Sequence, residues 1–381
     1  MKVLSVWDQR ISSEDILEQL LIDADIELES FVRELDINTS ELKPWLTFQK
    51  TAKSNFINKH FLIGRLLRLC SFIRMKKLVN KKIETFQPDI LLCHFGQTGA
   101  RFIKKAKKNK LPFVVIFYGH DISAALRSRR WRFNYRQFKN LTGTIIVLCV
   151  EAKQRLVQFG CRPESIVIWN LPLRFDFSIR DQPEIFNSPL QLVTAGRFVE
   201  KKGYPTLFAV IKKLRVEGIN VILHAFGYGA DFERIETMAR EADVIECINW
   251  HRNLIGQDFK EKYITTLRNA DLFLLASEIA SNGDDEGGPA LTLVIAQALG
   301  IPVVTTAFPG HEVTVVDGVT GFICEEPIVD NMVDHVRRLC DEFVFFQNVG
   351  KAGAIKAREE FDENKQTKTL IEILKTTSKC G

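Results

Sequence analysis

The chain has 381 residues, of which 46% are hydrophobic and 26% charged, the composition of a folded globular protein rather than a disordered, collagenous or disulfide-rich one. This length favours two domains, each large enough to bury its own core. No apolar run reaches the roughly 18 residues of a membrane-spanning helix. The N-terminal segment MKVLSVWDQR is too polar for a signal peptide, so we expect a cytoplasmic protein. The eight cysteines contain no C-x-x-C pair, which favours reduced thiols.

The net charge of +5 hides an uneven distribution along the chain. Residues 1–180 carry 31 Lys and Arg against 17 Asp and Glu, whereas residues 181–381 carry 21 against 30. Residues 51–150 alone have a net charge of +18. A basic half joined to an acidic half predicts that one domain faces an anionic partner.

In chain order, short apolar runs that are typical of strands alternate with helical patterns. In the first half, the predicted strands are residues 2–7, 27–32, 89–95, 113–119, 143–149 and 165–170. Most of these runs are continuously apolar, as are strands of a parallel sheet that is buried on both faces. A helix is expected over 150–160, where Gly160 ends it.

The same rhythm continues in the second half. The predicted strands are residues 190–196, 220–226, 244–250, 270–276, 301–307 and 321–326, with helices over 204–218 and 290–299. Repeated βα units predict an α/β architecture with doubly wound sheets. The pattern lapses between Asn170 and Pro189, and we place an interdomain linker at 176–189. The expected domains are therefore 1–175 and 190–356.

The segment GRFVEKKG at 196–203 directly follows a predicted strand. Ligands of such domains bind in the cleft outside the carboxyl ends of the strands. Arg197 and Lys202 would lie at that edge, and a guanidinium fork beside a point charge suits a diphosphate. A solvated charged loop explains the same spacing.

A second segment, NGDDEGGPALTLVIAQALG at 282–300, also follows a predicted strand. Gly287, Gly288 and Pro289 form a turn before the helix at 290, whose free N–H groups and positive dipole end suit an anion. Glu286 lies at the mouth of this turn, where its carboxylate can accept hydrogen bonds from sugar hydroxyls. An acidic loop before an ordinary helix start is the alternative.

In this order and spacing, the two segments resemble glycosyltransferase family 4, a family of nucleotide-sugar-dependent enzymes. The resemblance continues through HFG at 94–96, FYGHDIS at 117–123, VLCVEAKQRLVQFGCRPESIVIWN at 147–170, AFGYG at 225–229, PGHEVTVVDGVTGFICEEP at 309–327 and AREEFDENKQTKTLIEIL at 357–374. It is strongest to the enzymes of exopolysaccharide or lipopolysaccharide assembly. It implies the GT-B fold, in which two doubly wound Rossmann-like domains face a cleft. It also implies a UDP- or GDP-sugar substrate without metal or cofactor, and a C-terminal helix in 357–381 that returns to the first domain.

The resemblance also implies the roles of individual residues. Arg197 and Lys202 match the donor-diphosphate contacts of the family. Glu286 matches the first Glu of its paired-glutamate motif and is expected to contact the transferred sugar. The glycines expected beside the nucleotide or the sugar are Gly196, Gly227, Gly229, Gly287 and Gly288.

Three positions depart from the family pattern. The second Glu of the motif is replaced by Val294, or by Ile295 in an alternative alignment, and neither side chain can bind ribose hydroxyls. Tyr118 stands where the family has its active-site His, so either His120 or Tyr118 is expected to contact the donor sugar. The family's glycine-rich loop after the first strand is absent, and DQRISSEDI stands there.

Two further histidines lie on predicted strands. His94 ends a strand, where a place in the cleft and a structural role are equally compatible with the sequence. His224 lies within a strand and is expected to be a core residue with satisfied hydrogen bonds.

Residues 60–79, HFLIGRLLRLCSFIRMKKLV, predict an amphipathic helix with a narrow apolar stripe that faces the core. A second face mixes aromatic and cationic side chains, namely Phe61, Arg65, Arg68, Phe72, Lys76 and Val79. This face suits an anionic bilayer surface, and the basic stretches at 104–110 and 128–136 add to it. A buried helix whose arginine stems reach water is the alternative. Nucleic acid is not expected as a partner, because no nucleic-acid-binding fold accompanies the basic residues.

These inferences together predict a retaining, metal-independent hexosyltransferase of bacterial cell-surface polysaccharide synthesis. It would use a glycan or lipid-linked acceptor and lie on the inner face of the plasma membrane, with Glu286 and His120 orienting the sugar. The alternative is a catalytically weakened homologue that acts as a sugar-binding scaffold, as the three departures would allow. A GT-B epimerase or phosphorylase is a further alternative, because fold alone does not fix the reaction.

Overall fold

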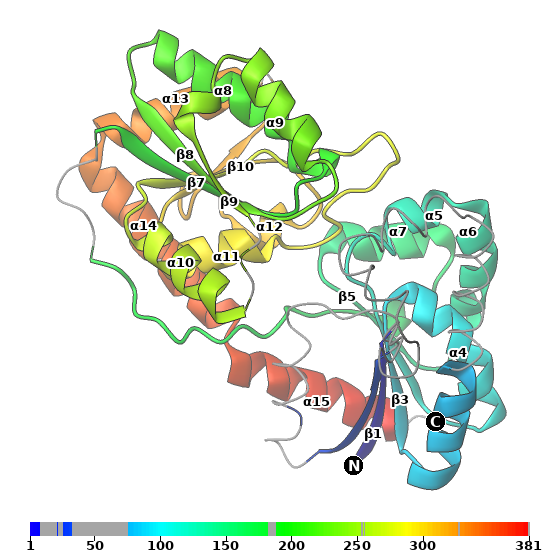
Figure 1. Cartoon of the computed structure of the whole chain (residues 1–381). Coiled ribbons are helices and arrows are strands. Elements are labelled where there is room, and N and C mark those ends of the chain that lie inside the picture. The colour runs from blue at the N-terminus through cyan, green and yellow to red at the C-terminus, as the bar shows by residue number, and fades with distance from the viewer. Residues whose placement is uncertain are drawn as a thin grey trace, which may run out of the picture. The chain divides into compact units, whose positions relative to one another are not determined.

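The protein is described from a computed structural model that covers residues 1–7, 21, 26–32, 75–181, 188–252, 254, 256–326 and 328–379. All of the predicted strands are present, and they form two six-stranded parallel sheets (Figure 1). Continuous burial of the central strands explains why their sequences are apolar without alternation. The α/β class is confirmed.

The first sheet has the strand order β2-β1-β3-β4-β5-β6. Its strands are β1 Lys2–Trp7, β2 Glu27–Val32, β3 Ile90–His94, β4 Phe113–Ile116, β5 Thr144–Val147 and β6 Ile166–Ile168. The connecting helices include α4 Gly96–Lys108, α5 Ala124–Arg127, α6 Arg129–Tyr135 and α7 Val150–Phe159. As predicted, α7 ends at Gly160, which has a left-handed φ of 100°.

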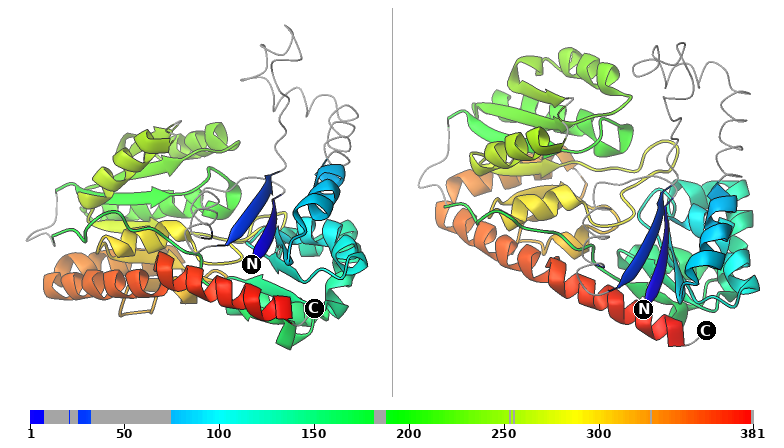
Figure 2. Two further views of the ribbon diagram at one scale, coloured as in Figure 1. Left: turned by 90° about the horizontal axis from the view of Figure 1, so that it is seen from below. Right: turned by 60° about the horizontal axis from the view of Figure 1, so that its bottom comes forward.

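The second sheet has the order β12-β11-β10-β7-β8-β9. Its strands are β7 Leu190–Ala195, β8 Val221–Gly227, β9 Ile248–Arg252, β10 Leu272–Leu275, β11 Val303–Thr306 and β12 Phe322–Cys324. One face packs against α8 Tyr204–Val216, α9 Phe232–Glu241 and α13 Ile328–Asp341. The other packs against α10 Gly256–Arg268 and α11 Leu291–Ala298. Figure 2 shows these two helical layers around the sheet.

The chain divides by its contacts into two compact units. The first unit comprises Met1–Phe117, Phe133–Ile146 and Thr367–Gly381, and the second comprises Tyr118–Arg132 and Val147–Gln366. The expected boundaries at 175 and 190, and the return of 357–381 to the first domain, stay predictions. The segment before the expected linker is fixed within the second unit, where Leu173 donates a backbone hydrogen bond to Phe361 O at 2.9 Å.

Two elements differ from the predictions. The strand expected at 244–250 begins later, because Asp243 has a left-handed φ of 60° and Ile245–Cys247 form a 3-10 turn before β9. The C-terminal helix expected in 357–381 is divided between two helices, α14 Phe343–Glu360 and α15 Glu363–Lys379. The break has a local cause, since Asp362 Oδ1 accepts the backbone N–H of Lys365 at 2.8 Å, as a residue capping a helix does.

Most of the amphipathic helix expected at 60–79 lies outside the described residues, including Phe61, Arg65, Arg68 and Phe72. Residues 75–86 are helical, and Lys76 is exposed. Val79 is expected on the same face, but its side chain is 0% exposed, so this position packs against the core instead. In the described part of the chain, no helix has both the length and the apolar character needed to cross a bilayer.

Candidate functional site

The predicted site residues converge where the winding direction of the second sheet reverses. In the strand order, β7 lies between β10 and β8, so the crossovers from β7 and from β10 leave on opposite faces. Loops that follow two such strands diverge and leave a crevice at their carboxyl ends, the usual ligand position in doubly wound sheets. Gly196 follows β7, and Ser277 and Glu286 follow β10.

A buried ion pair joins these two loops. Lys202 Nζ lies 2.7 Å from Glu286 Oε1, and the two side chains are only 11% and 10% exposed. Ser277 Oγ donates to the same carboxylate oxygen at 2.7 Å. Burial alone would raise the pKa of Glu286, but the charges of the neighbouring lysines and the two hydrogen bonds lower it below its ordinary value. The Glu286 carboxylate is therefore ionised at neutral pH.

The loop before Glu286 forms a second charged group that the sequence reasoning missed. Lys201 is 5% exposed, and its Nζ donates to the carbonyl oxygen of Asp285 at 2.6 Å and lies 3.3 Å from Asp284 Oδ2. His120 Nδ1 lies 3.5 Å from Asp284 Oδ1. The contact with Asp284 raises the pKa of His120, although partial burial opposes this. The adjacent Lys-Lys and Asp-Asp pairs in the sequence were the available signal.

His120 is brought to this group by a tight turn after β4. The Asp121 carboxylate is buried and accepts backbone N–H groups from Tyr118 at 3.0 Å and Gly119 at 2.8 Å. Gly119 and Gly287 are in backbone contact, since a Cβ on Gly287 would lie 2.5 Å from Gly119 Cα. Gly287 also has a left-handed φ of 62°. The glycine turn therefore fixes the distance between the His120 turn and the Glu286 loop.

The glycines of the other predicted loop have a packing role. A Cβ on Gly227 would lie 1.9 Å from Gly196 O, and one on Gly229 would lie 2.2 Å from Phe198 O. Phe198 is buried and contacts the ring of Phe232, with the ring centroids 5.1 Å apart. Phe198 is thus buried, while the preceding residue, Arg197, is exposed at the carboxyl end of β7. Close approach of the backbone thus explains why residues 227 and 229 are glycines, without the need for a role in ligand binding.

Helix α11 begins directly behind the glycine turn. Its first residue follows Ala290, whose side chain makes no capping hydrogen bond. Val294 is 0% exposed and packs in an apolar cluster with Leu173, Ala298, Ala357 and Phe361. Ile295 is only partly buried. The side chain of Val294 therefore faces the core, and of the two positions only 295 is partly open to solvent.

The remaining predicted histidines have structural partners. His94 is completely buried, and its Nε2 lies 3.2 Å from Ser5 Oγ. Burial holds the pKa of His94 well below its ordinary value, so the ring is neutral. His224 is hydrogen-bonded as expected, to Gln191 Oε1 at 2.9 Å and to His251 at 3.1 Å, although it is only half-buried.

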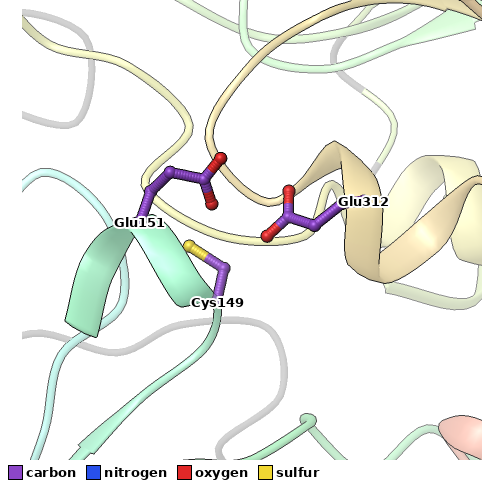
Figure 3. Close-up of side chains that lie close together, drawn as sticks. All are labelled: Cys149, Glu151 and Glu312. Carbon is purple, nitrogen blue, oxygen red and sulfur yellow. The ribbon is translucent and has the colours of Figure 1, made fainter. Parts of the chain in front are cut away.

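A separate carboxyl pair lies beside the start of α7 (Figure 3). Cys149 Sγ and one carboxylate oxygen each of Glu151 and Glu312 lie within 4.8 Å of one another. Among the described residues, Glu151 Oε2 and Glu312 Oε1 are buried without a hydrogen-bond partner. Burial and the contact with Glu151 raise the pKa of Glu312, and burial raises the pKa of Cys149 to about 12. A thiol that stays protonated and a Glu312 carboxyl with a raised pKa are poor ligands for a metal ion.

Comparison with known proteins agrees with this architecture. Residues 176–367 match the family described as glycosyl transferases group 1. The amylovoran biosynthesis glycosyltransferase AmsK of Erwinia amylovora is 27% identical over 321 residues, which cover 83% of this chain and 77% of that protein.

Two solved structures share the fold over nearly the whole chain. The apo form of the lipopolysaccharide outer core galactosyltransferase WaaB has a TM-score of 0.67 at 18% identity, with 99% of both chains covered. Anabaena HepE in complex with UDP-glucose has a TM-score of 0.69 at 14% identity, with 99% of this chain and 100% of that chain covered. This protein therefore has the GT-B fold and belongs to the glycosyl transferases group 1 family.

Proposed function

We propose that the protein is a retaining, metal-independent hexosyltransferase that transfers a sugar from a nucleotide-sugar to a glycan or lipid-linked acceptor. The buried Lys202–Glu286 pair is the observation that carries this proposal. It places a cation and an ionised carboxylate side by side at the switch point of the second sheet. A diphosphate needs the first of these groups and a sugar needs the second.

The proposed chemistry uses these groups in turn. Lys202 and Arg197 stabilise the charge that develops on the departing nucleoside diphosphate, and the positive dipole end of α11 adds to this stabilisation. Glu286 accepts hydrogen bonds from hydroxyls of the transferred sugar. His120, whose side chain is 62% exposed, binds a further hydroxyl while Asp284 fixes its ring. Holding the sugar in one orientation lowers the entropic part of the barrier to attack by the acceptor hydroxyl.

The relatives support a role in bacterial surface polysaccharide synthesis. AmsK is named for amylovoran biosynthesis, and WaaB for the outer core of lipopolysaccharide. UDP-glucose in the HepE structure supports a UDP-sugar as the donor, with a GDP-sugar as the alternative. A hexose is the transferred group in this proposal.

Peripheral attachment to the inner face of the plasma membrane is the second part of the proposal. In the first unit, a cavity of about 370 Å³ lies between α4 and the segment 136–142. The exposed cations Lys104, Lys107 and Arg136 border it, and its apolar wall includes Ile103 and Phe113. Cations around an apolar groove suit the headgroup and first methylenes of an anionic phospholipid. Wild type should float with phosphatidylglycerol vesicles, and the Lys104→Glu/Lys107→Glu variant should not. Unchanged flotation would contradict this docking surface.

Donor binding is the direct test of the transferase proposal. Thermal shifts should be measured with UDP-, GDP- and ADP-sugars on wild type, Arg197→Ala and the control Lys212→Ala, an exposed residue on α8. We expect stabilisation by one nucleotide class, lost in Arg197→Ala and kept in Lys212→Ala. No stabilisation by any donor would refute the nucleotide-sugar proposal.

A scaffold without turnover is the second candidate, favoured by the burial of Val294 where the family has its second Glu. A scaffold would bind a sugar nucleotide without consuming it. Release of nucleoside diphosphate, measured with the stabilising donor, separates the two candidates. Release that is lost in Lys202→Ala supports the transferase, and binding without any release supports the scaffold.

A further inference from the structure

A cavity of about 310 Å³ in the second unit lies outside the proposed donor site. It is formed by the segment that contains α5, by α7 and by the loop at Gly283 and Asp285. Three arginines line it, namely Arg127, Arg132 and Arg155. The apolar side chains of Ile122, Leu126 and Phe159 also line it.

The cavity has more positive than negative charge. Arg155 NH2 lies 2.7 Å from Asp285 Oδ2, and the Asp285 side chain is 4% exposed. Arg127 and Arg132 are exposed, and neither forms an ion pair with any carboxylate in the described ranges. Arg127 is nevertheless held in place by packing, because a Cβ on Gly283 would lie 2.4 Å from its Cδ. Two guanidinium groups thus face the cavity without a counter-charge.

This composition selects a particular class of ligand. A guanidinium group can bind two oxygens of one phosphate at once. Two guanidinium groups without a neighbouring carboxylate match the negative charge of a diphosphate. The adjacent apolar residues suit a hydrocarbon that leaves the diphosphate. A free sugar would need neither feature.

The position of the cavity relates it to the acceptor rather than to the donor. Gly283 and Asp285 border the cavity, and the next residue, Glu286, pairs with Lys202 on the donor side. One short loop therefore contributes to both places. An acceptor must bind beside the donor for its hydroxyl to reach the reacting carbon.

We propose that this cavity binds the diphosphate of an isoprenoid-linked acceptor, with Arg127 and Arg132 as its principal ligands and Phe159 against the first isoprene unit. The inference rests on the proposed transferase function, which requires an acceptor. Membership of the family does not itself specify an acceptor with this chemistry.

The test uses two probes and a background without the donor-side cation. Inorganic pyrophosphate and geranyl diphosphate are titrated calorimetrically into the full chain carrying Lys202→Ala, which weakens diphosphate binding at the donor site. Arg127→Ala and Arg132→Ala are then added singly. Arg129→Ala is the matched control, because Arg129 is exposed on the same helix as Arg132 but does not line the cavity.

Arg127→Ala and Arg132→Ala should each lower the affinity for geranyl diphosphate about tenfold, which is the effect of losing one charge-assisted interaction. Arg129→Ala should leave this affinity unchanged. Geranyl diphosphate should bind more tightly than pyrophosphate, and Phe159→Ala should remove that advantage. Equal affinity for the two probes would overturn the lipid assignment in favour of free diphosphate. Affinities that are insensitive to both arginines would overturn the site.

Hydrolysis of the donor in the absence of acceptor reports on the donor site alone, so it distinguishes a failure of the cavity from a failure of the proposed function. Arg127→Ala and Arg132→Ala in the otherwise wild-type chain should retain it, because neither residue touches the Lys202–Glu286 pair. Donor binding that is absent from wild type would refute the transferase proposal, while the probe titrations still decide whether the cavity binds an isoprenoid diphosphate. Circular dichroism of each variant checks that the fold is retained.

Discussion

Replacing Lys202 by Met removes the only cation that lies within 4 Å of the Glu286 carboxylate in the described chain and keeps most of the side-chain volume. Removal of one partner from a buried ion pair destabilises proteins by about 3–5 kcal/mol, because an uncompensated charge stays behind. Ser277 still donates to Glu286 in the variant, so we expect the lower end of this range. The double variant Lys202→Met/Glu286→Gln removes both charges and should recover about 2 kcal/mol of the loss.

The stability that Lys202→Met loses should depend on pH. In wild type the lowered pKa of Glu286 means that its contribution is present above its unfolded-state pKa and is lost as the pH falls through the folded-state value. In Lys202→Met the unpaired, buried carboxyl has a raised pKa, so its penalty grows as the pH rises through that value. The variant should therefore lose less stability at pH 5 than at pH 8.

Urea unfolding followed by tryptophan fluorescence measures these differences, with wild type, both single variants and the double variant compared at the two pH values. Free energies that add without coupling would refute the assignment of an ion pair. A Lys202→Met penalty that is the same at pH 5 and pH 8 would refute the assignment of a buried, ionised Glu286.

Three further predictions test neighbouring parts of the account. A Cβ on Gly229 would lie 2.2 Å from a backbone carbonyl oxygen, so Gly229→Ala should destabilise by about 1–3 kcal/mol in thermal unfolding, and an unchanged melting temperature would contradict this packing. Burial and the contact with Glu151 raise the pKa of Glu312, so the stability that Glu312 contributes is lost as the pH rises through its folded-state pKa. Glu151→Gln removes the like charge and should raise the melting temperature at pH 8 but not at pH 5, and an equal effect at both pH values would contradict this assignment. Ile295→Glu should be tolerated and strengthen donor binding about fivefold, whereas Val294→Glu should unfold the protein, and thermal shifts with equal effects at both positions would contradict the orientation of α11.

Much of the fold could be predicted because the strands are short, apolar and separated by helices with clear ends. Gly160 ends α7 for a reason that is visible in the sequence, namely the left-handed conformation that glycine adopts without a steric penalty. The break between α14 and α15 could not be predicted from periodicity. It depends on the cap at Asp362 and on the burial of Phe361 in a cluster that includes Leu173, which is distant in the sequence.

The candidate site was only partly predictable. Lys202 and Glu286 were recognisable because their segments follow predicted strands and resemble motifs of the family. That β7 and β10 are neighbours, which brings the two side chains together, is seen only in the structure. The contact of His120 with Asp284 was not, because it depends on backbone approach between the Gly119 turn and a loop far along the chain. Periodicity and spacing carry no information on that distance.

We propose that Lys202 and its loop bind the donor through its diphosphate. Calorimetric titration of the stabilising nucleoside diphosphate and of its parent nucleoside, into wild type and Lys202→Ala, tests this claim most directly. We predict that the diphosphate binds wild type more tightly than the nucleoside by about a hundredfold, and that most of this difference disappears in the variant. A difference of the same size in both proteins would contradict the account.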